Sequence, residues 1–218
     1  MGAELVAVNV GRAVPVDWAD GEDATAIDKR PLTGRVAVHR LGVTGDVQVF
    51  SGHGGPDQAV YAYAREDAAW WERELDRPLR PGMFGENLTT SGLDVTGALI
   101  GERWRIGSVT LEVTSPRIPC RTFAGFWDVR DLIKRFTARG WPGAYLRVIE
   151  EGELAAGDRV EVVHRPDHGV TIGVTFRART TEPALLPRLL DAPELPEPWQ
   201  RQVRKRLGEA ADQPEPAP

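Results

Sequence analysis

The chain has 218 residues, of which 41% are hydrophobic and 27% charged, as in an ordinary globular protein. This length allows one large domain, or one domain with a small appendage. The net charge of −5 argues against a nucleic-acid or anionic membrane surface as the main partner. The sequence has no apolar run near the roughly 20 residues of a membrane helix, and no N-terminal basic region followed by an apolar core. One cysteine cannot form an internal disulfide, so we expect a cytoplasmic protein without a membrane or nucleic-acid partner.

The first half of the chain predicts short strands separated by polar or glycine-rich turns. We expect strands at 4–10 and 35–41, with a polar loop at 11–26 between them. Residues 65–75 predict a helix, because Ala68, Trp71 and Leu75 recur at helical spacing among charged residues.

The second half begins with two strands over 101–114, around a turn at 107–108. Apolar and polar residues alternate strictly over 109–114, which predicts a half-buried strand. Residues 128–140 predict a helix that begins at the capping residue Asp128, presents an apolar stripe and ends at Gly140. Further strands are expected at 144–149 and 158–164.

After residue 164 the strand alternation stops and prolines separate short helical stretches. The last of these, about 198–207, places Trp199, Val203 and Leu207 on one face. We therefore expect a mainly β body over 1–164 that forms a closed or nearly closed β-barrel with flanking helices. A small helical appendage over 165–208 and a disordered tail over 209–218 would complete the chain.

The most informative residue is the single cysteine, Cys120, because it follows the strand at 109–114 on a loop stiffened by Pro116 and Pro119. Arg117 precedes it by three residues and Arg121 follows it directly. Nearby cations favour the thiolate, which is both the nucleophile and the metal-ligand form. Many lone cysteines are simply small buried hydrophobic residues. A loop with two prolines and two arginines suits that interpretation poorly, so we favour a functional thiol.

A second informative stretch is GHGGPDQAV at 52–60, where His53 precedes Gly54 and Gly55. Adjacent glycines allow unusual backbone conformations and the close approach of a ligand, although such a pair is also typical of a tight turn. Asn87, in FGEN, is either a ligand contact or a turn residue that satisfies its own backbone. The adjacent cations Lys29 and Arg30 are either a binding pair or a solvated pair.

Several common sites are absent from the sequence. The single cysteine and four histidines show no zinc-binding spacing, and the chain has neither dinucleotide nor P-loop glycine motifs, nor a G-x-S-x-G hydrolase motif. A nucleophilic pair of Cys120 with His53, as in a thiol hydrolase, is allowed by composition but not indicated by spacing. The remaining combination is a thiolate, glycine-rich turns and the cations Lys29, Arg30, Arg35 and Arg117. It suits an anionic ligand, or a metal held partly by sulfur.

In several of these stretches the chain resembles the MOSC domain family, named after the C-terminal part of molybdenum cofactor sulfurase, and within it the YiiM-like branch. The matching stretches, in family order, are AIDKRP (26–31), Gly45-Asp46 with Gln48, GHGGPDQAV (52–60), FGENLTT (84–90), PRIPC (116–120), 143–145 and 157–158. The stretch from 169 to about 207 resembles the three-helix appendage of that branch.

The resemblance implies a MOSC-type β-barrel that binds the molybdenum cofactor, a molybdopterin, with Cys120 as catalytic residue and molybdenum ligand. It implies that Lys29, His53, Gly54, Gly55, Asn87 and Arg117 line the pterin and its phosphate. The implied activity is an oxidoreductase that reduces N-hydroxylated bases of the 6-hydroxylaminopurine type and related N- and S-oxides. One departure from the family pattern is Val49-Phe50, where Ala-Asp is usual; it removes a carboxylate near the expected pocket.

Electrons for such a reduction must come from elsewhere, because the chain has no cysteine cluster for an iron–sulfur centre and no flavin or nicotinamide motif. We therefore expect a separate flavin-dependent reductase or a ferredoxin-type electron donor as partner. The alternative is a non-catalytic module that carries the molybdenum cofactor, or that carries sulfur as a persulfide on Cys120.

Overall fold

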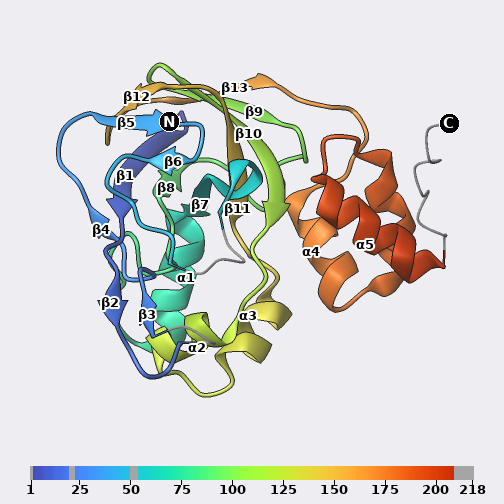
Figure 1. Ribbon diagram of the computed structural model, residues 1–218, viewed down its shortest axis with the longest axis horizontal. Helices are drawn as coiled ribbons and strands as arrows, with labels where there is room; N and C mark the ends of the chain where they lie inside the picture. The colour runs from blue at the N-terminus through green and yellow to red at the C-terminus, as the bar shows by residue number, and fades with distance from the viewer. Residues whose placement is uncertain (1, 20–22, 50–53, 209–218) are drawn as a thin grey trace, which may run out of the picture.

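The computed structural model describes residues 2–19, 23–49 and 54–208. In Figure 1 the strands and three of the helices form one body, and the C-terminal helical segments pack against one side of it. The strands are β1 (Glu4–Val10), β2 (Val14–Pro15), β3 (Ala24–Thr25), β4 (Arg30–Pro31), β5 (Val36–His39), β6 (Gly42–Val43), β7 (Val60–Ala64), β8 (Leu88–Ser91), β9 (Arg103–Ile106), β10 (Val109–Pro116), β11 (Ala144–Glu150), β12 (Gly152–Leu154) and β13 (Val160–His164). The helices are α1 (Arg65–Leu75), α2 (Arg121–Trp127), α3 (Leu132–Arg139), α4 (Ile172–Thr180) and α5 (Glu197–Leu207), with 3-10 helices η1 (Pro56–Gln58) and η2 (Pro183–Asp191).

The main sheet has eight strands in the order β13-β9-β10-β11-β7-β8-β1-β4, and only its β7–β8 pair is parallel. A three-stranded sheet, β12-β5-β6, and the hairpin β2–β3 lie beside it. The fold is thus mixed α/β around one large, mostly antiparallel sheet. The strand predictions at 4–10 and 101–114 and the helix prediction at 65–75 are confirmed.

The expectation of a closed barrel is not confirmed. Between the two sides of the sheet, the described residues form one isolated bridge, Glu4 with Arg159, with backbone hydrogen bonds around it, and no continuous ladder. The reason lies in β1, whose C-terminal end pairs with β4 and leaves only its first residues free to meet the segment before β13. Pro31 in β4 has no N–H, so this edge is poorly suited to extend the ladder.

Strand β10 is buried on both faces, whereas the alternation predicted a half-buried strand. The polar side chains on the second face are satisfied by partners that are far away in the sequence. Thr110 Oγ1 donates to Glu150 at 2.5 Å, and Glu112 forms ion pairs with Arg103 and Arg147. Buried polar groups are stable only when paired in this way.

The helix predicted over 128–140 is wrong at its start. Asp128 is the left-handed C-terminal cap of α2, a short helix that the sequence patterns did not predict, and α3 begins at Leu132. Gly140 closes α3 as expected, and Phe136 is buried on its inner face. Consequently Cys120 stands directly before a helix rather than on a long loop.

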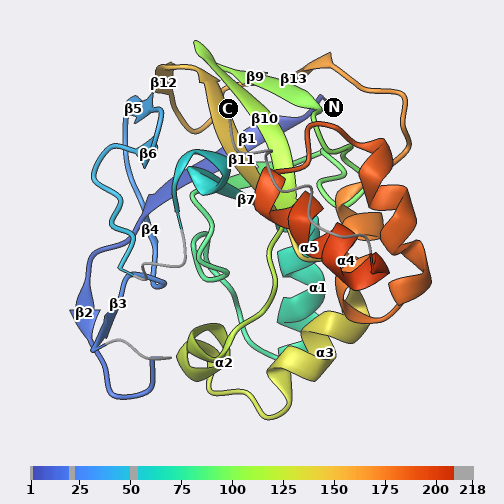
Figure 2. The same ribbon diagram turned by 45° about the vertical axis from the view of Figure 1, so that its right-hand side comes forward.

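The C-terminal segment consists of α4, η2 and α5, and Figure 2 shows it lying beside β10 and β11. One hydrophobic cluster joins residues of the sheet, such as Leu111, to Ile172, Leu189 and Val203 of this segment. The appendage is therefore packed onto the sheet rather than tethered to it. The division of the chain at residue 164 stays a prediction, and residues 209–218 lie outside the described residues.

A second, aromatic cluster lies between α1, α2, α3 and the sheet. Phe84 stacks on Tyr63 with ring centroids 4.1 Å apart, and Phe123 contacts Phe136 edge to face at 5.1 Å. Cys120 packs against this cluster and is partly exposed. Large rings buried in this way hold the N-terminal end of α2 in place.

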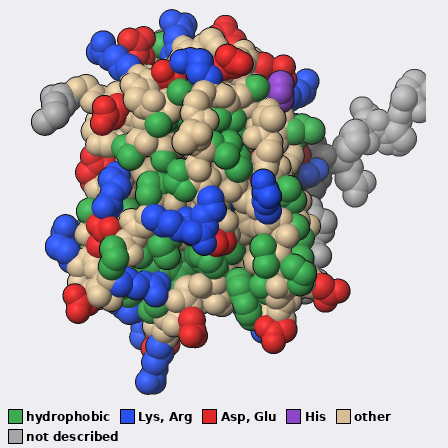
Figure 3. Space-filling view, turned by 90° about the vertical axis from the view of Figure 1, so that its left-hand side faces the viewer, with side chains coloured by type: hydrophobic (Ala, Val, Ile, Leu, Met, Phe, Trp, Pro, Cys, Tyr) green, Lys and Arg blue, Asp and Glu red, His purple; other side chains and the backbone are tan. Residues whose placement is uncertain are grey.

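The molecular surface over the N-terminal strands carries basic, acidic and hydrophobic side chains in alternation (Figure 3). Ion pairs at this kind of surface, such as Arg35 with Asp158 at 3.2 Å, contribute little to stability. None of the helices in the described part of the chain has the length and apolar character needed to cross a membrane.

Asp67, in the first turn of α1, generates a prediction about the pH dependence of stability. Burial and the nearby carboxylates of Asp94 and Glu66 raise its pKa to about 7 from an ordinary 3.8. The folded protein therefore binds this proton more tightly than the unfolded chain. The resulting stabilisation is complete below about pH 4 and is lost as the pH rises through 7.

We expect Asp67→Asn to increase the free energy of unfolding at pH 8 by about 1–2 kcal/mol, after allowance for partial exposure, and to have no such effect at pH 4. Urea unfolding at both pH values measures this, with the exposed Asp191→Asn as control. An equal effect of Asp67→Asn at pH 4 and pH 8 would contradict the assignment.

Candidate functional site

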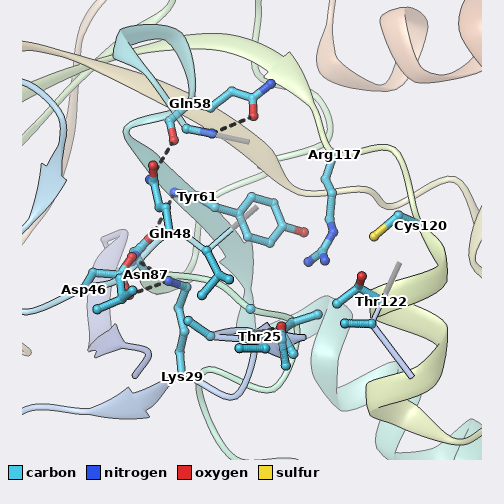
Figure 4. Close-up of a pocket in the computed structure, with 18 of the residues that line it drawn as sticks. Thr25, Lys29, Asp46, Gln48, Gln58, Tyr61, Asn87, Arg117, Cys120 and Thr122 are labelled. Atoms are coloured by element: carbon cyan, nitrogen blue, oxygen red, sulfur yellow. Dashed lines mark hydrogen bonds and ion pairs between the residues drawn. The ribbon is translucent and has the colours of Figure 1, made fainter. Parts of the chain in front are cut away.

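A pocket of about 770 Å³, counting space open to solvent, lies where the N-terminal loops, β7, β11 and the start of α2 meet (Figure 4). Its lining comprises Ala19, Ala24, Thr25, Ala26, Ile27, Lys29, Asp46, Val47, Gln48, Val49, Gly54, Gln58, Tyr61, Gly85, Asn87, Arg117, Cys120, Thr122 and Tyr145. Segments far apart in the sequence thus share one cavity.

Arg117 and Cys120 reach the pocket from the end of β10. The Arg117 guanidinium lies 4.5 Å from the ring centroid of Phe123 and 5.3 Å from that of Tyr61, and it donates to the carbonyl oxygen of Phe84. Figure 4 shows the Tyr61 hydroxyl and the Cys120 sulfur pointing toward this guanidinium. The sulfur is therefore beside a fixed positive charge.

The charge of Arg117 is buried, since only 6% of the residue is exposed, and the described residues place no carboxylate within ion-pair distance of it. Burial alone lowers the pKa of Arg117, but Tyr61, Tyr145 and Cys120 act in the opposite direction and the net pKa is raised. Burial also raises the pKa of Tyr145, so its phenol stays neutral. A buried cation without a carboxylate favours an anionic ligand or a thiolate beside it.

Lys29, the other cation in the pocket, is already neutralised. Its ammonium lies 2.5 Å from both carboxylate oxygens of Asp46, and the two side chains are 9% and 4% exposed. Burial lowers the pKa of Lys29, while Asp46 acts in the opposite direction. Asn87 Nδ2 donates to the same carboxylate at 2.8 Å. Lys29, Asp46 and Asn87 therefore form a polar, nearly uncharged wall.

One of the two interpretations made Asn87 a turn residue that satisfies its own backbone. The hydrogen bonds of its side chain exclude that interpretation. Its Oδ1 accepts from the backbone N–H of Tyr61 at 3.1 Å, and its Nδ2 also donates to the carbonyl oxygen of Asn9 at 3.2 Å. The side chain thus joins β7, β1 and Asp46. An amide that holds three segments together fixes the shape of this pocket wall.

The loop before β8 is held by the buried carboxylate of Glu86. Glu86 accepts from the backbone N–H of Gly82 at 2.6 Å, from that of Phe84 at 2.9 Å and from Thr89 Oγ1 at 2.8 Å. Burial raises the pKa of Glu86, and these donors oppose the rise. Gly85, directly before Glu86, has φ +75°, and a Cβ there would approach Arg117 Nη1 to 3.3 Å. Glu86 therefore positions the carbonyl that orients Arg117.

The glycine-rich stretch contributes Gly54 and Gln58. The Gly54 backbone N–H donates to Gln58 Oε1 at 3.4 Å, and a Cβ on Gly54 would overlap the side chain of Gln48. Gly55 begins η1 and is not in the pocket lining. His53 lies outside the described residues.

Of the cations considered from the sequence, Arg30 and Arg35 are away from the pocket. Arg30 pairs with Asp28 at 2.6 Å and Arg35 pairs with Asp158 at 3.2 Å, both at exposed positions. Arg121 is exposed and is not in the lining either. Thus the pocket lining brings Lys29, Gly54, Asn87, Arg117 and Cys120 together.

The lining residues that were not among the predicted site residues include Asp46, Tyr61 and Tyr145. Asp46 was visible only as part of a matched motif. Tyr61 and Tyr145 are directly opposite one another on β7 and β11, with ring centroids 5.1 Å apart. Strand patterns cannot show such a pair before the pairing of the strands is known.

Cys120 is the one soft donor in the pocket. Among the described residues, no three His, Cys, Asp or Glu side chains are grouped so as to hold a metal ion by themselves. A metal at Cys120 would thus need its other ligands from a bound organic group. The guanidinium of Arg117 offers hydrogen-bond donors to such a group.

The Lys29–Asp46 pair generates a stability prediction. We expect Asp46→Asn to lower the free energy of unfolding by about 3 kcal/mol, because it leaves a buried ammonium without a counter-ion. The control is Glu197→Gln, which removes an exposed helical pair with Arg201 and should cost less than about 0.5 kcal/mol. Urea unfolding compares the two variants, and similar small losses would show that the pair is not desolvated.

Comparison with known proteins shows to which family the chain is related. The family model of the MOSC domain matches residues 50–161. The uncharacterized protein YflK of Bacillus subtilis (strain 168) is 31% identical over 206 residues, 93% of each chain, and protein YiiM of Escherichia coli (strain K12) is 31% identical over 193 residues, 84% of each. A protein named reductase from Gibberella moniliformis is 33% identical over 168 residues, which are 74% of this chain and 29% of the fungal protein.

The fold agrees with these relationships. The crystal structure of YiiM from Geobacillus stearothermophilus superimposes with a TM-score of 0.79 at 29% identity, over 94% of this chain and 99% of that one. The MOSC match covers just over half of the sequence, and the YiiM likeness covers nearly all of it. The chain therefore belongs to the MOSC domain family and is similar to its YiiM members.

Proposed function

We propose that this protein is a molybdenum-cofactor-dependent oxidoreductase that reduces N-hydroxylated bases of the 6-hydroxylaminopurine type and related N- and S-oxides. The observation that carries the proposal is the pairing of Cys120 with the buried guanidinium of Arg117, which has no carboxylate partner among the described residues. A soft sulfur ligand beside an uncompensated cation suits an anionic, metal-containing ligand.

The residues present fit the molybdenum cofactor. Cys120 would hold the metal, Arg117 and the backbone near Gly54 would bind the phosphate, and Asn87 would contact the pterin. The Cβ-free backbone at Gly85 keeps space beside Arg117 for such a ligand. When bound, the cofactor would supply a centre that accepts oxygen and cycles by two electrons.

The chain's own part would be to bind, orient and exclude water. Tyr61 and Tyr145 close one side of the pocket with neutral phenols. Ile27, Val47 and Val49 add apolar side chains to the lining. Phe50, which stands at the position of the family carboxylate, lies outside the described residues. Asp46 supplies a carboxylate in the pocket, but its charge is matched by Lys29. An uncharged, planar substrate suits these walls best.

The electron donor is proposed to be a separate flavin-dependent reductase or ferredoxin-type protein. In support, the fungal relative named reductase is more than three times as long as the matched region, which covers 29% of it. The additional length could carry the electron-supplying part. A thiol that serves as a metal ligand must also stay reduced, which suits a cytoplasmic protein.

The decisive variant is Cys120→Ser, expressed in a host that makes the cofactor. We expect the wild-type protein to contain molybdenum and to reduce 6-hydroxylaminopurine and a sulfoxide panel with a chemical electron donor. The variant should lose at least about 100-fold in activity, as is typical when an essential group is removed, with an unchanged melting temperature. Metal analysis and substrate reduction measure the two properties.

Equal molybdenum in wild type and Cys120→Ser would refute the ligand assignment. A persulfide on Cys120, detected by mass spectrometry in wild type without molybdenum or reduction, would favour the carrier alternative. Activity that is lost on alkylation but needs no metal would instead indicate a thiol hydrolase. The matched control is Ser108→Ala, a hydroxyl change in the β9–β10 turn away from the pocket.

A further inference from the structure

Arg147, on β11, joins three parts of the molecule. Its guanidinium lies 3.0 Å from Asp57 Oδ1 and 3.4 Å from Glu112 Oε1, and it donates to the backbone carbonyl of Glu194 at 3.1 Å. Glu112 is directly opposite Arg147 on β10. Asp57 belongs to η1 and Glu194 to the segment between η2 and α5. One side chain thus ties the sheet, η1 and the appendage together.

On the η1 side, Arg147 contacts Asp57, which is the neighbour in sequence of a residue in the pocket wall. Asp57 is also held by Thr114 Oγ1, which lies 2.6 Å from its carbonyl oxygen. Gln58, next in the chain, accepts the backbone N–H of Gly54 and contacts the side-chain amide of Gln48 through its carbonyl oxygen at 3.5 Å. Gly54, Gln58 and Gln48 all line the pocket.

On the appendage side, Glu194 is itself anchored. Its carboxylate lies 3.5 Å from His168 Nε2, and the same nitrogen lies 2.9 Å from the carbonyl oxygen of Ile100. The side chain of Glu194 also packs on Gly101 so tightly that a Cβ there would come within 2.6 Å. The carbonyl that faces Arg147 therefore has a position set by the packing of the appendage.

We propose that Arg147 is a positioning residue through which the C-terminal appendage sets the shape of the pocket wall formed by Gly54, Gln58 and Gln48. The planar guanidinium satisfies Asp57, Glu112 and Glu194 in one geometry, so a displacement of the appendage moves η1. This proposal concerns the same site as the proposed function. The measurements of KM and kcat that test it rest on the proposed function, whereas the measurement of hydrogen exchange in the pocket wall does not.

The experiment compares the full-length variants Arg147→Met, Arg147→Lys and His168→Ala with the wild-type protein. The control is Arg135→Met, which removes an ion pair with Glu74 of similar exposure, on α3 and away from η1. Amide hydrogen exchange is followed by mass spectrometry for peptides that cover 54–61. Where the protein carries cofactor, KM, kcat and molybdenum content are measured for an oxide substrate.

We expect Arg147→Met to speed exchange at 54–61 by about tenfold, as for loss of a charge-assisted contact, and to raise KM more than it changes kcat or molybdenum content. Arg147→Lys should restore part of the protection, because it keeps the charge for Asp57 but not the fork geometry. His168→Ala touches neither the pocket nor η1, and it should nevertheless speed exchange at 54–61.

Unchanged exchange at 54–61 in His168→Ala would overturn the coupling to the appendage. A fall in melting temperature for Arg147→Met without a local change at 54–61 would reduce Arg147 to a general stabilising residue and overturn the proposal. Absence of oxide reduction by the wild-type protein, with the exchange pattern as expected, would refute the proposed function and leave the positioning role in place.

Discussion

The buried positive charge of Arg117 is the constraint on which the pocket depends. Taking a guanidinium out of water costs several kcal/mol unless other groups compensate for the lost hydration. Here the rings of Tyr61 and Phe123 and the carbonyl of Phe84 provide part of that compensation. The remainder must come from negative charge beside it. An anionic ligand in the pocket is in a position to supply it.

The other ionic groups of the pocket, among the described residues, are matched with one another or with backbone donors and not with Arg117. Lys29 and Asp46 neutralise one another, and Glu86 is used by backbone donors of its own loop. The ionic groups farther out, Arg147, Asp57 and Glu112, are likewise matched among themselves. Each pair fixes a segment of chain, and none of these carboxylates lies within ion-pair distance of Arg117.

Family membership and this geometry support each other at different levels. The likeness to YiiM proteins concerns the whole fold, and it would hold even if the site had lost its activity. The position of Cys120 beside Arg117 concerns chemistry, and it is specific to these side chains. The proposed reductase activity draws on both, whereas the role of Arg147 draws only on contacts within this chain.

Several parts of the site could be predicted from local sequence, because they depend on groups close together in the chain. Pro116, Pro119 and Arg117 set the surroundings of Cys120 within five residues, and glycines mark the turn at 54–55. The interpretation of Lys29 could not be decided locally, because its counter-ion, Asp46, lies 17 residues away. The same holds for Asn87, whose partners are on β1 and β7.

For the fold, the sequence by itself determined where most strands and the helix α1 lie, since hydrophobic periodicity reflects which face of each element is buried. It misjudged β10, because a strand that is buried on both faces keeps an alternating pattern when its polar residues find distant partners such as Glu150 and Arg147. Only the tertiary structure decided that the sheet stays open beside β4 and that α2 separates Cys120 from α3. The open sheet edge and the position of α2 depend on which segments pair with the edge of β1 and which side chains fill the space beside the sheet. Both are decided by packing between residues far apart in the chain.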